Sequence, residues 1–407
     1  MPTKNLICVV VEGLHAGMVG AYGNSWIRTA ALDALACESF LFDQAFIESP
    51  LLEQTYRAYW HGLHTADRRT LEDDERSLPR LLTDGGMHTA LLTDSSEVAG
   101  LLPAAEFAEQ LLIESPENAH SADDIAETGL ARLFGAATEW LRAPREPFCL
   151  WVHARGMAGP WDAPLEMRNR FADEDDPQPP PLVEVPDHWL PDDFDPDESL
   201  GIKHAYAGQM ALLDLCLGAF LDEFDASPLA ENTQLTFIST AGYPLGDHRR
   251  IGPCDDALYN ELTQLVWMMR FPDGLGKLSR TQALVQPSDL PATLLEWLEL
   301  DRARFAGTGA SSLLSLIRGE VESLRDRLLM VGRHDRALRT PAWHLRQPLT
   351  GAPELYSKPA DRWEASEVAN LLPDIVLGMQ AALDEIASTG SIGDLPPLEE
   401  ALTSEMD

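Results

Sequence analysis

Residues 5–24 read NLICVVVEGLHAGMVGAYGN, and this stretch decides the fold. Residues 6–11 form a short apolar run rich in β-branched side chains, which predicts a strand covered on both faces. Glu12 follows directly where this strand should end. In open α/β sheets, ligands bind at the carboxyl ends of the strands. The stretch therefore predicts an α/β fold with Glu12 at the edge of the sheet where a binding site would lie.

The rest of the chain alternates between strand-like and helical patterns. Strand-like runs recur at 89–93, 148–153, 235–240 and 265–270, and helical patterns lie at 29–38, 126–142, 205–224 and 290–300. This alternation predicts a large, mostly parallel sheet with helices on both faces.

The pattern changes near residue 325, which predicts an α/β domain over 1–325, a small C-terminal subdomain over 326–387 and a flexible tail over 388–407. Residues 173–200 are too rich in proline and acidic residues to predict regular structure. We expect a surface insertion there, either solvated decoration or a lid or docking loop.

The composition excludes several classes of partner. The formal net charge is −36, so nucleic acid and anionic membrane surfaces would be repelled. No apolar run approaches the roughly 18 residues that a membrane span needs. The N-terminal sequence also has no signal-peptide pattern, which predicts a cytoplasmic protein.

Several segments, in chain order, resemble the sulfatase family of the alkaline phosphatase superfamily. The first is the GxYGN element that ends at Asn24, and the others lie at 32–36, 40–50, 151–164, 205–214, 233–240, 284–294 and 354–364. The resemblance implies the sulfatase fold and a sulfuric ester hydrolase that uses a divalent metal.

The family's catalytic positions are changed in this chain. Its metal-binding pair of consecutive aspartates corresponds to Glu12-Gly13. Its nucleophile, a formylglycine made from Cys or Ser in a Cys-x-Pro-x-Arg motif, falls on Leu52 or Glu53, depending on the register. Of that motif only Arg57 remains.

The other family positions are changed in the same way. The second metal-ligand pair corresponds to Thr240-Ala241, and the cationic or histidine contacts to sulfate correspond to Asp94, Ser96, Ala158 and Pro253. A divalent cation prefers about six oxygen ligands, often with two or more carboxylates, and Glu12 is the sole residual ligand position. The resemblance therefore predicts a pseudoenzyme without cofactor or metal. We expect a binding or regulatory role toward a small anion or a protein. The expected assembly is either a homo-oligomer or a hetero-oligomer with a paralogue.

Two interpretations stay open for each remaining polar residue of the presumed cleft. Glu12 is either a ligand or general base, or a carboxylate bonded to backbone N–H groups or to Arg57. His61, with His64 nearby, indicates either a two-histidine metal site or polar packing. Thr55 is either a hydroxyl for phosphoryl transfer or the N-cap of a helix over 56–63.

The same applies to two later positions. His153 is either a cleft residue or a satisfied histidine at the core edge. Asp247-His248 is either an acid–base pair or part of a loop salt-bridged through Arg249 and Arg250. The alternative function is an active sulfuric or phosphoric ester hydrolase that holds Ca²⁺ or Mg²⁺ in a rebuilt site, formed by Glu12, Thr55, His61, His153 and His248.

Overall fold

The computed structural model describes residues 4–67, 75–114, 120–181, 183–254, 257–303, 305, 310–389 and 395–404. These residues form two compact units. The first unit comprises Met1–Leu41, Leu82–Pro253 and Leu265–Arg280, and the second comprises Phe42–Leu81, Cys254–Gln264 and Thr281–Asp407. The domain division predicted at residue 325 stays a prediction.

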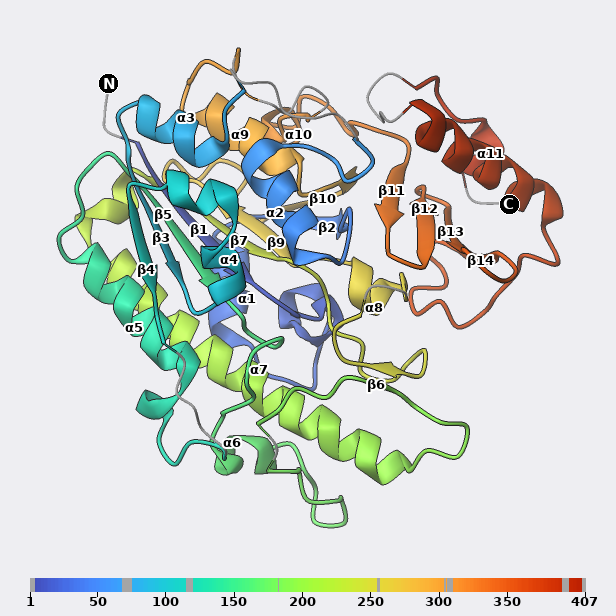
Figure 1. Ribbon diagram of the computed structural model, residues 1–407, viewed down its shortest axis with the longest axis horizontal. Coiled ribbons are helices and arrows are strands. Elements are labelled where there is room, and N and C mark those ends of the chain that lie inside the picture. Colours follow the sequence, from blue (N-terminus) through green and yellow to red (C-terminus); the bar gives the residue numbers. More distant parts are fainter. Residues whose placement is uncertain are drawn as a thin grey trace. The chain divides into compact units, whose positions relative to one another are not determined.

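The main sheet has eight strands in the order β10-β2-β9-β7-β1-β5-β3-β4 (Figure 1). Their bounds are β1 Asn5–Val11, β2 Phe40–Ala45, β3 His88–Thr93, β4 Glu109–Leu112, β5 Phe148–Ala154, β7 Thr233–Ser239, β9 Trp267–Arg270 and β10 Ser279–Val285. The pairs β1–β5, β1–β7, β3–β5 and β3–β4 are parallel, whereas β9 is antiparallel to β7 and β2. The predicted α/β fold with a mostly parallel sheet is confirmed.

Strand β1 lies between β5 and β7, so it is central in the parallel part of the sheet. Cys8, for example, pairs with Trp151 of β5 and Thr236 of β7. Every residue of β1 is buried, as the uninterrupted apolar run predicts for a strand covered on both faces. The residue that follows β1 therefore lies at the middle of the sheet's carboxyl edge.

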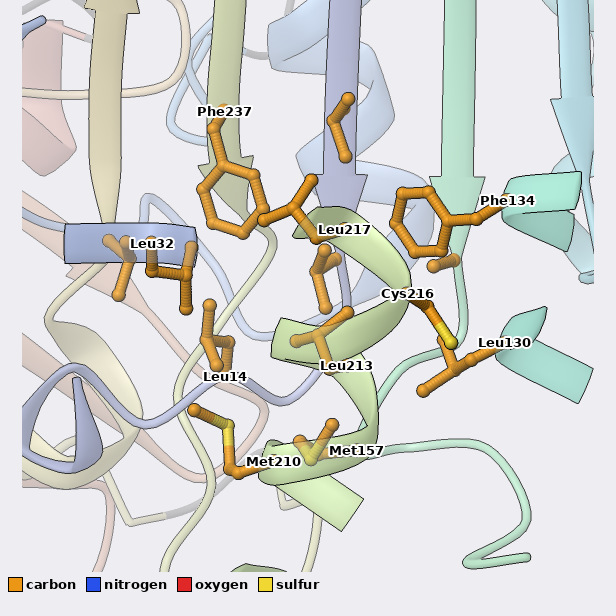
Figure 2. Packing of buried hydrophobic residues seen from close by; sticks show 14 of the residues in the cluster. Leu14, Leu32, Leu130, Phe134, Met157, Met210, Leu213, Cys216, Leu217 and Phe237 are labelled. Carbon is orange, nitrogen blue, oxygen red and sulfur yellow. The ribbon is translucent and has the colours of Figure 1, made fainter. Parts of the chain in front are cut away.

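Three helices of the first unit pack against one another beside this sheet: α1 (Ala30–Cys37), α5 (Gly129–Leu141) and α7 (Pro196–Asp225). Their apolar side chains form the core shown in Figure 2, where Leu217 of α7 lies near Phe237 of β7. Asp214 of α7 fixes the start of α1, because its carboxylate accepts hydrogen bonds from the N–H groups of Ala31 and Leu32 at 3.1 and 2.9 Å.

Shorter elements complete the first unit. They are η1 Ala16–Met18, η2 Gly20–Tyr22, α4 Ser96–Ala99, η3 Leu102–Glu106, η4 Ile125–Glu127, α6 Leu165–Asn169, β6 His188–Trp189, η5 Pro228–Glu231 and β8 Arg250–Ile251. Helix α7 begins at Pro196, inside the stretch predicted as an irregular insertion over 173–200. Asp195 caps α7 by accepting from the N–H of Asp197, and the proline occupies the first helical turn, where no N–H is needed.

The second unit carries a four-stranded antiparallel sheet in the order β11-β12-β13-β14, which corresponds to the small C-terminal part expected from the sequence. Its elements are α2 Leu52–His61, α8 Asn260–Thr263, α9 Asp289–Trp297, α10 Leu314–Ile317, β11 Leu328–Val331, β12 Asp335–Arg339, β13 Trp343–Pro348, β14 Glu354–Ser357, α11 Pro373–Thr389 and η6 Glu400–Leu402. Helix α3 (Leu78–Asp84) spans the boundary between the units.

Part of the predicted flexible tail is ordered against this C-terminal sheet. Leu402 is buried in the same apolar cluster as Trp343 of β13, and the Trp343 indole N–H donates to the carbonyl of Ala401 at 3.0 Å. The expectation of a loose tail from residue 388 therefore does not describe residues 395–404. Residues 390–394 and 405–407 lie outside the described residues.

Candidate functional site

The candidate site is built where strands β1, β5 and β7 end together. The N–H of Glu12 donates to the carbonyl of Ala154 at 3.0 Å, and the N–H of Thr240 donates to the carbonyl of Val11 at 3.0 Å. These bonds continue the sheet by one residue on each side of β1. They place Glu12, the end of β5 and the Thr240-Ala241 segment at one edge, as parallel strands require.

Glu12 forms a close pair with His153 at this edge. Glu12 Oε1 lies 2.8 Å from His153 Nε2. The His153 side chain is fully buried, and that of Glu12 is 16% exposed. The sequence predicts backbone N–H groups or Arg57 as hydrogen-bond partners of a structural Glu12 carboxylate. The structure corrects this prediction, because the partner of this carboxylate is His153. It was missed because the two residues are 141 positions apart in the chain.

Asp94 brings a second carboxylate to the same edge, at the end of β3. Its Oδ1 accepts a hydrogen bond from the N–H of Arg155 at 2.8 Å. Burial raises the pKa of Asp94 above its ordinary value; the Arg155 N–H and the charges of His153 and Arg155 oppose this rise, and the charge of Glu12 adds to it. The residue that stands where the family has a lysine is therefore held by the backbone of the turn after β5.

The turn after β5 lies directly on Glu12 and Gly13. The N–H of Met157 donates to the carbonyl of Glu12 at 2.9 Å. Gly13 has φ +69°, and a Cβ added there would lie 3.0 Å from the N atom of Ala158 and 3.2 Å from the carbonyl carbon of Met157. Position 13, which the sequence predicts to correspond to the family's second aspartate, thus has a backbone conformation that favours glycine and leaves only a tight fit for a side chain.

Tyr206 of α7 holds the next residues of this loop. Its hydroxyl donates to the carbonyl of Gly13 at 3.0 Å and accepts from the N–H of His15 at 2.9 Å. Burial raises the pKa of Tyr206, so its hydroxyl stays protonated and can serve as this donor. The Tyr206 ring packs against Trp161 and Tyr243, with centroids 5.8 and 5.2 Å away. The loop after β1 is therefore fixed by protein contacts on two sides.

Asp247 and His248 lie in the loop after β7. Asp247 Oδ1 is 3.6 Å from Lys203 Nζ on α7. Arg249 pairs with Asp192 at 2.5 Å, and Arg250 pairs with Asp187. This loop is salt-bridged through Arg249 and Arg250, as one interpretation of the sequence predicts. The acidic partners of the two arginines lie in the 173–200 stretch.

The positions that correspond to the family's nucleophile motif belong to the second unit. Leu52 and Glu53 form the first turn of α2. Thr55 lies inside α2 and is not its N-cap, because the helix begins at Leu52. The Thr55 hydroxyl donates to the carbonyls of Ser49 and Leu51 at 3.3 and 3.2 Å, which is the back-bonding geometry common for threonine inside helices.

The remaining polar candidates surround the end of α2. Arg57 donates to the carbonyl of His64 at 3.2 Å. His64 Nε2 lies 3.1 Å from the carbonyl of Leu329, and its Nδ1 accepts from the N–H of Ala66 at 2.9 Å. Both ring nitrogens of His64 are thus used in structural contacts. His61 is the last residue of α2, and Gly62 ends the helix in the left-handed conformation.

The family model for sulfatases matches residues 4–300 of the chain. The chain belongs to the sulfatase family. The uncharacterized sulfatase YidJ of Escherichia coli is 20% identical over 352 residues, which cover 74% of this chain and 69% of that protein.

Solved structures share the fold. The phosphonate monoester hydrolase of Agrobacterium radiobacter superposes with a TM-score of 0.78 at 16% identity, covering 95% of this chain and 96% of that one. A protein solved in complex with its substrate, D-glucosamine-2-N,6-O-disulfate, gives a TM-score of 0.77 at 14% identity, covering 95% and 98% of the two chains.

The described residues of this sulfatase-family chain do not fit the divalent cation that the family resemblance implies. Throughout the described part of the chain, no group of three or more His, Cys, Asp or Glu side chains is arranged to hold a metal ion. Glu12 is paired with His153, and the neighbouring position 13 has no side chain.

Among the described residues, no helix is long and apolar enough to cross a membrane.

Proposed function

We propose that this sulfatase-family protein is a pseudoenzyme that does not hydrolyse sulfuric esters and acts through binding or regulation. The observation that carries the proposal is the set of side chains at the carboxyl end of β1. There the single carboxylate that corresponds to the family's metal-binding pair is 2.8 Å from a buried histidine. The adjacent position is a glycine with φ +69°, and a Cβ there would lie 3.0 Å from the N atom of Ala158 in the turn after β5.

Chemical reasoning supports the same proposal. Sulfuric ester hydrolysis of the family's type needs a nucleophile and a metal that neutralises charge on the reacting group. The nucleophile position is Leu52 or Glu53, neither of which yields a formylglycine. Asp94 adds a negative charge where the family has a lysine, which would repel a sulfate group. A small anion or a protein partner, including a paralogous subunit, remains the proposed binding partner.

The proposal is tested by assaying purified protein against p-nitrophenyl sulfate, p-nitrophenyl phosphate and a phenyl phosphonate ester, each with Ca²⁺, Mg²⁺ or Mn²⁺. We expect no metal-dependent turnover above that of a heat-denatured sample, alongside an active sulfatase as positive control. Metal-dependent turnover that is abolished in Glu12→Gln would overturn the proposal.

One observation favours a second function, an ester hydrolase with a rebuilt site. Glu12 and His153 form a carboxylate–imidazole pair at hydrogen-bond distance, which is the arrangement of a general base and the group that orients it. In this case turnover would be independent of added metal and would be lost in both Glu12→Gln and His153→Phe. Thr55 is not supported as its nucleophile, since its hydroxyl donates to carbonyls within its own helix region.

A further inference from the structure

A groove of about 700 Å³ lies in the second unit, between the turn that joins β13 to β14 and the first turns of α11. Its apolar walls are Pro348 and Pro353 on the turn, and Val376 and Leu377 on the helix. We refer to it as the α11 groove. Its size is within the range of pockets that hold a ligand or several side chains of a partner.

One large exposed apolar side chain lines the α11 groove, and two more are exposed on the segments that form it. Leu377, which lines it, is 64% exposed. Leu349 and Leu371 directly follow the lining residues Pro348 and Asn370 in the chain, and they are 64% and 76% exposed. A single exposed leucine is ordinary in a soluble protein. An exposed leucine in the wall of a groove, with two further exposed leucines on the segments that form the groove, indicates an interaction surface.

The chain itself covers the other sides of α11. Met379, Leu383 and Ile386 are buried in the apolar cluster of the C-terminal sheet. A Cβ added at Gly378 would lie 3.0 Å from Leu402, so the tail segment packs closely on that side of the helix. Leu377 therefore lies on the exposed side of α11, together with Asp374, Ala381 and Asp384, and it also lines the groove.

The polar part of the groove is acidic. Glu354 Oε1 lies 2.8 Å from the Arg346 guanidinium, which also pairs with Asp335 at 2.8 Å. Arg346 also lines the groove, the Asp335 side chain is fully buried, and Glu354 Oε2 accepts from the hydroxyls of Tyr259 and Tyr356 at 2.8 and 3.0 Å. Glu367, also in the lining, is exposed and adds another negative charge. Its Oε1 accepts from the N–H of Leu355 at 3.2 Å, and a carboxylate has further acceptor sites for an incoming donor.

We propose that the α11 groove binds a segment of another protein in which leucine-like side chains are flanked by lysine or arginine. The apolar walls would take the apolar side chains, and the exposed Glu367 would pair with a basic one. A second copy of this chain is disfavoured as the occupant, because each copy carries a net charge of −36 and would present an acidic groove to an acidic surface. The inference is independent of whether the β1 edge has hydrolytic activity.

The test uses a fluorescein-labelled amphipathic peptide of leucine and lysine, with fluorescence anisotropy measured at physiological salt. Two further peptides serve as probes: one has glutamate in place of every lysine, and the other has serine in place of every leucine. Each is titrated with the wild-type protein, with Leu377→Ser, and with the matched variant Leu102→Ser. Leu102 is 90% exposed and lies in the first unit.

We expect the leucine–lysine peptide to bind wild type and Leu102→Ser alike, and to bind Leu377→Ser roughly tenfold more weakly, since one apolar side-chain contact is lost. The other two peptides should bind at least that much more weakly than the first. Equal binding to all three proteins would overturn the inference, because it would show attraction by net charge alone. Undetectable binding would also overturn it.

Two additional measurements keep the test decisive. Thermal unfolding of Leu377→Ser should match that of wild type, since the side chain is exposed. Sedimentation velocity should show no dimer that depends on Leu377; such a dimer would identify a second copy as the occupant and overturn the proposed partner. Peptide binding and ester hydrolysis are separate readouts, so failure of one proposal is distinguishable from failure of the other.

Discussion

Substituting Gly13 by alanine tests whether the chain has room for a side chain where the family has its second aspartate. Gly13 has φ +69°, a conformation that costs a non-glycine residue about 1–2 kcal/mol. The added Cβ would also lie 3.0 Å from the N atom of Ala158. Overpacking of this kind costs about 1–3 kcal/mol. We therefore expect Gly13→Ala to lower the free energy of unfolding by about 2–5 kcal/mol.

Gly274→Ala is the matched control. Gly274 lies in the same compact unit, has φ +75°, and nothing lies within 4 Å of its Cβ position. It bears the backbone cost alone, so the difference between the two variants isolates the contact with the turn after β5. Both changes affect the entropy of the unfolded chain equally, and that effect cancels.

The assay is urea unfolding followed by circular dichroism and tryptophan fluorescence. The two variants should show unchanged m values and midpoints whose difference corresponds to about 1–3 kcal/mol. If Gly13→Ala is no less stable than Gly274→Ala, position 13 has room for a side chain, and the argument from crowding fails. Gly13→Asp should be destabilised at least as much as Gly13→Ala.

Three further predictions concern buried charges and thiols. Burial raises the pKa of Asp94, so ionised Asp94 lowers the stability of the folded state above its ordinary pKa of about 4. Asp94→Asn should therefore raise the free energy of unfolding at pH 7. This gain should shrink as the pH falls from the raised folded-state pKa toward about 4, and should be absent below that. An unchanged difference between pH 7 and pH 3 would contradict this. Arg325→Met should lower the free energy of unfolding in urea by about 3–5 kcal/mol, because it leaves the fully buried Asp289 without the cation that lies 2.6 Å away. The control Arg318→Met removes an exposed ion pair and should lower it by under about 1 kcal/mol. Similar losses of stability in the two variants would refute the reasoning. Burial raises the pKa of the Cys149 thiol to about 12. A thiol reagent at pH 8 should therefore label the exposed Cys37 first and Cys149 only after unfolding, as measured by mass spectrometry. Labelling of Cys149 in the folded protein would contradict its burial.

The fold could be predicted because its signal is local. The apolar run before Glu12 and the similar run that ends at His153 each specify a buried strand by composition alone. Glu12 and His153 were also recognisable individually, since each is a titratable residue at a strand end, where parallel strands meet at one edge. Their pairing could not be predicted, because it depends on the register of β1 against β5, which is set by contacts far apart in the chain.

Two other differences concern the residues at which helices begin. Thr55 resembles an N-cap by residue type, yet α2 begins at Leu52, a residue with no capping side chain before it. Tertiary contacts, which the sequence pattern does not display, decide where this helix begins. Helix α7 begins at Pro196, because a proline is compatible with the first turn of a helix even inside a stretch whose composition favours irregular structure.

Metal binding tests the central claim most directly. Protein stripped with a chelator is titrated with Ca²⁺ and with Mg²⁺ by isothermal calorimetry, in parallel with Glu12→Gln, and the metal content of the native protein is measured by mass spectrometry. The account predicts no stoichiometric ion in the native protein and no saturable heat that differs between wild type and Glu12→Gln. One ion bound per chain, with binding lost in Glu12→Gln, would contradict it.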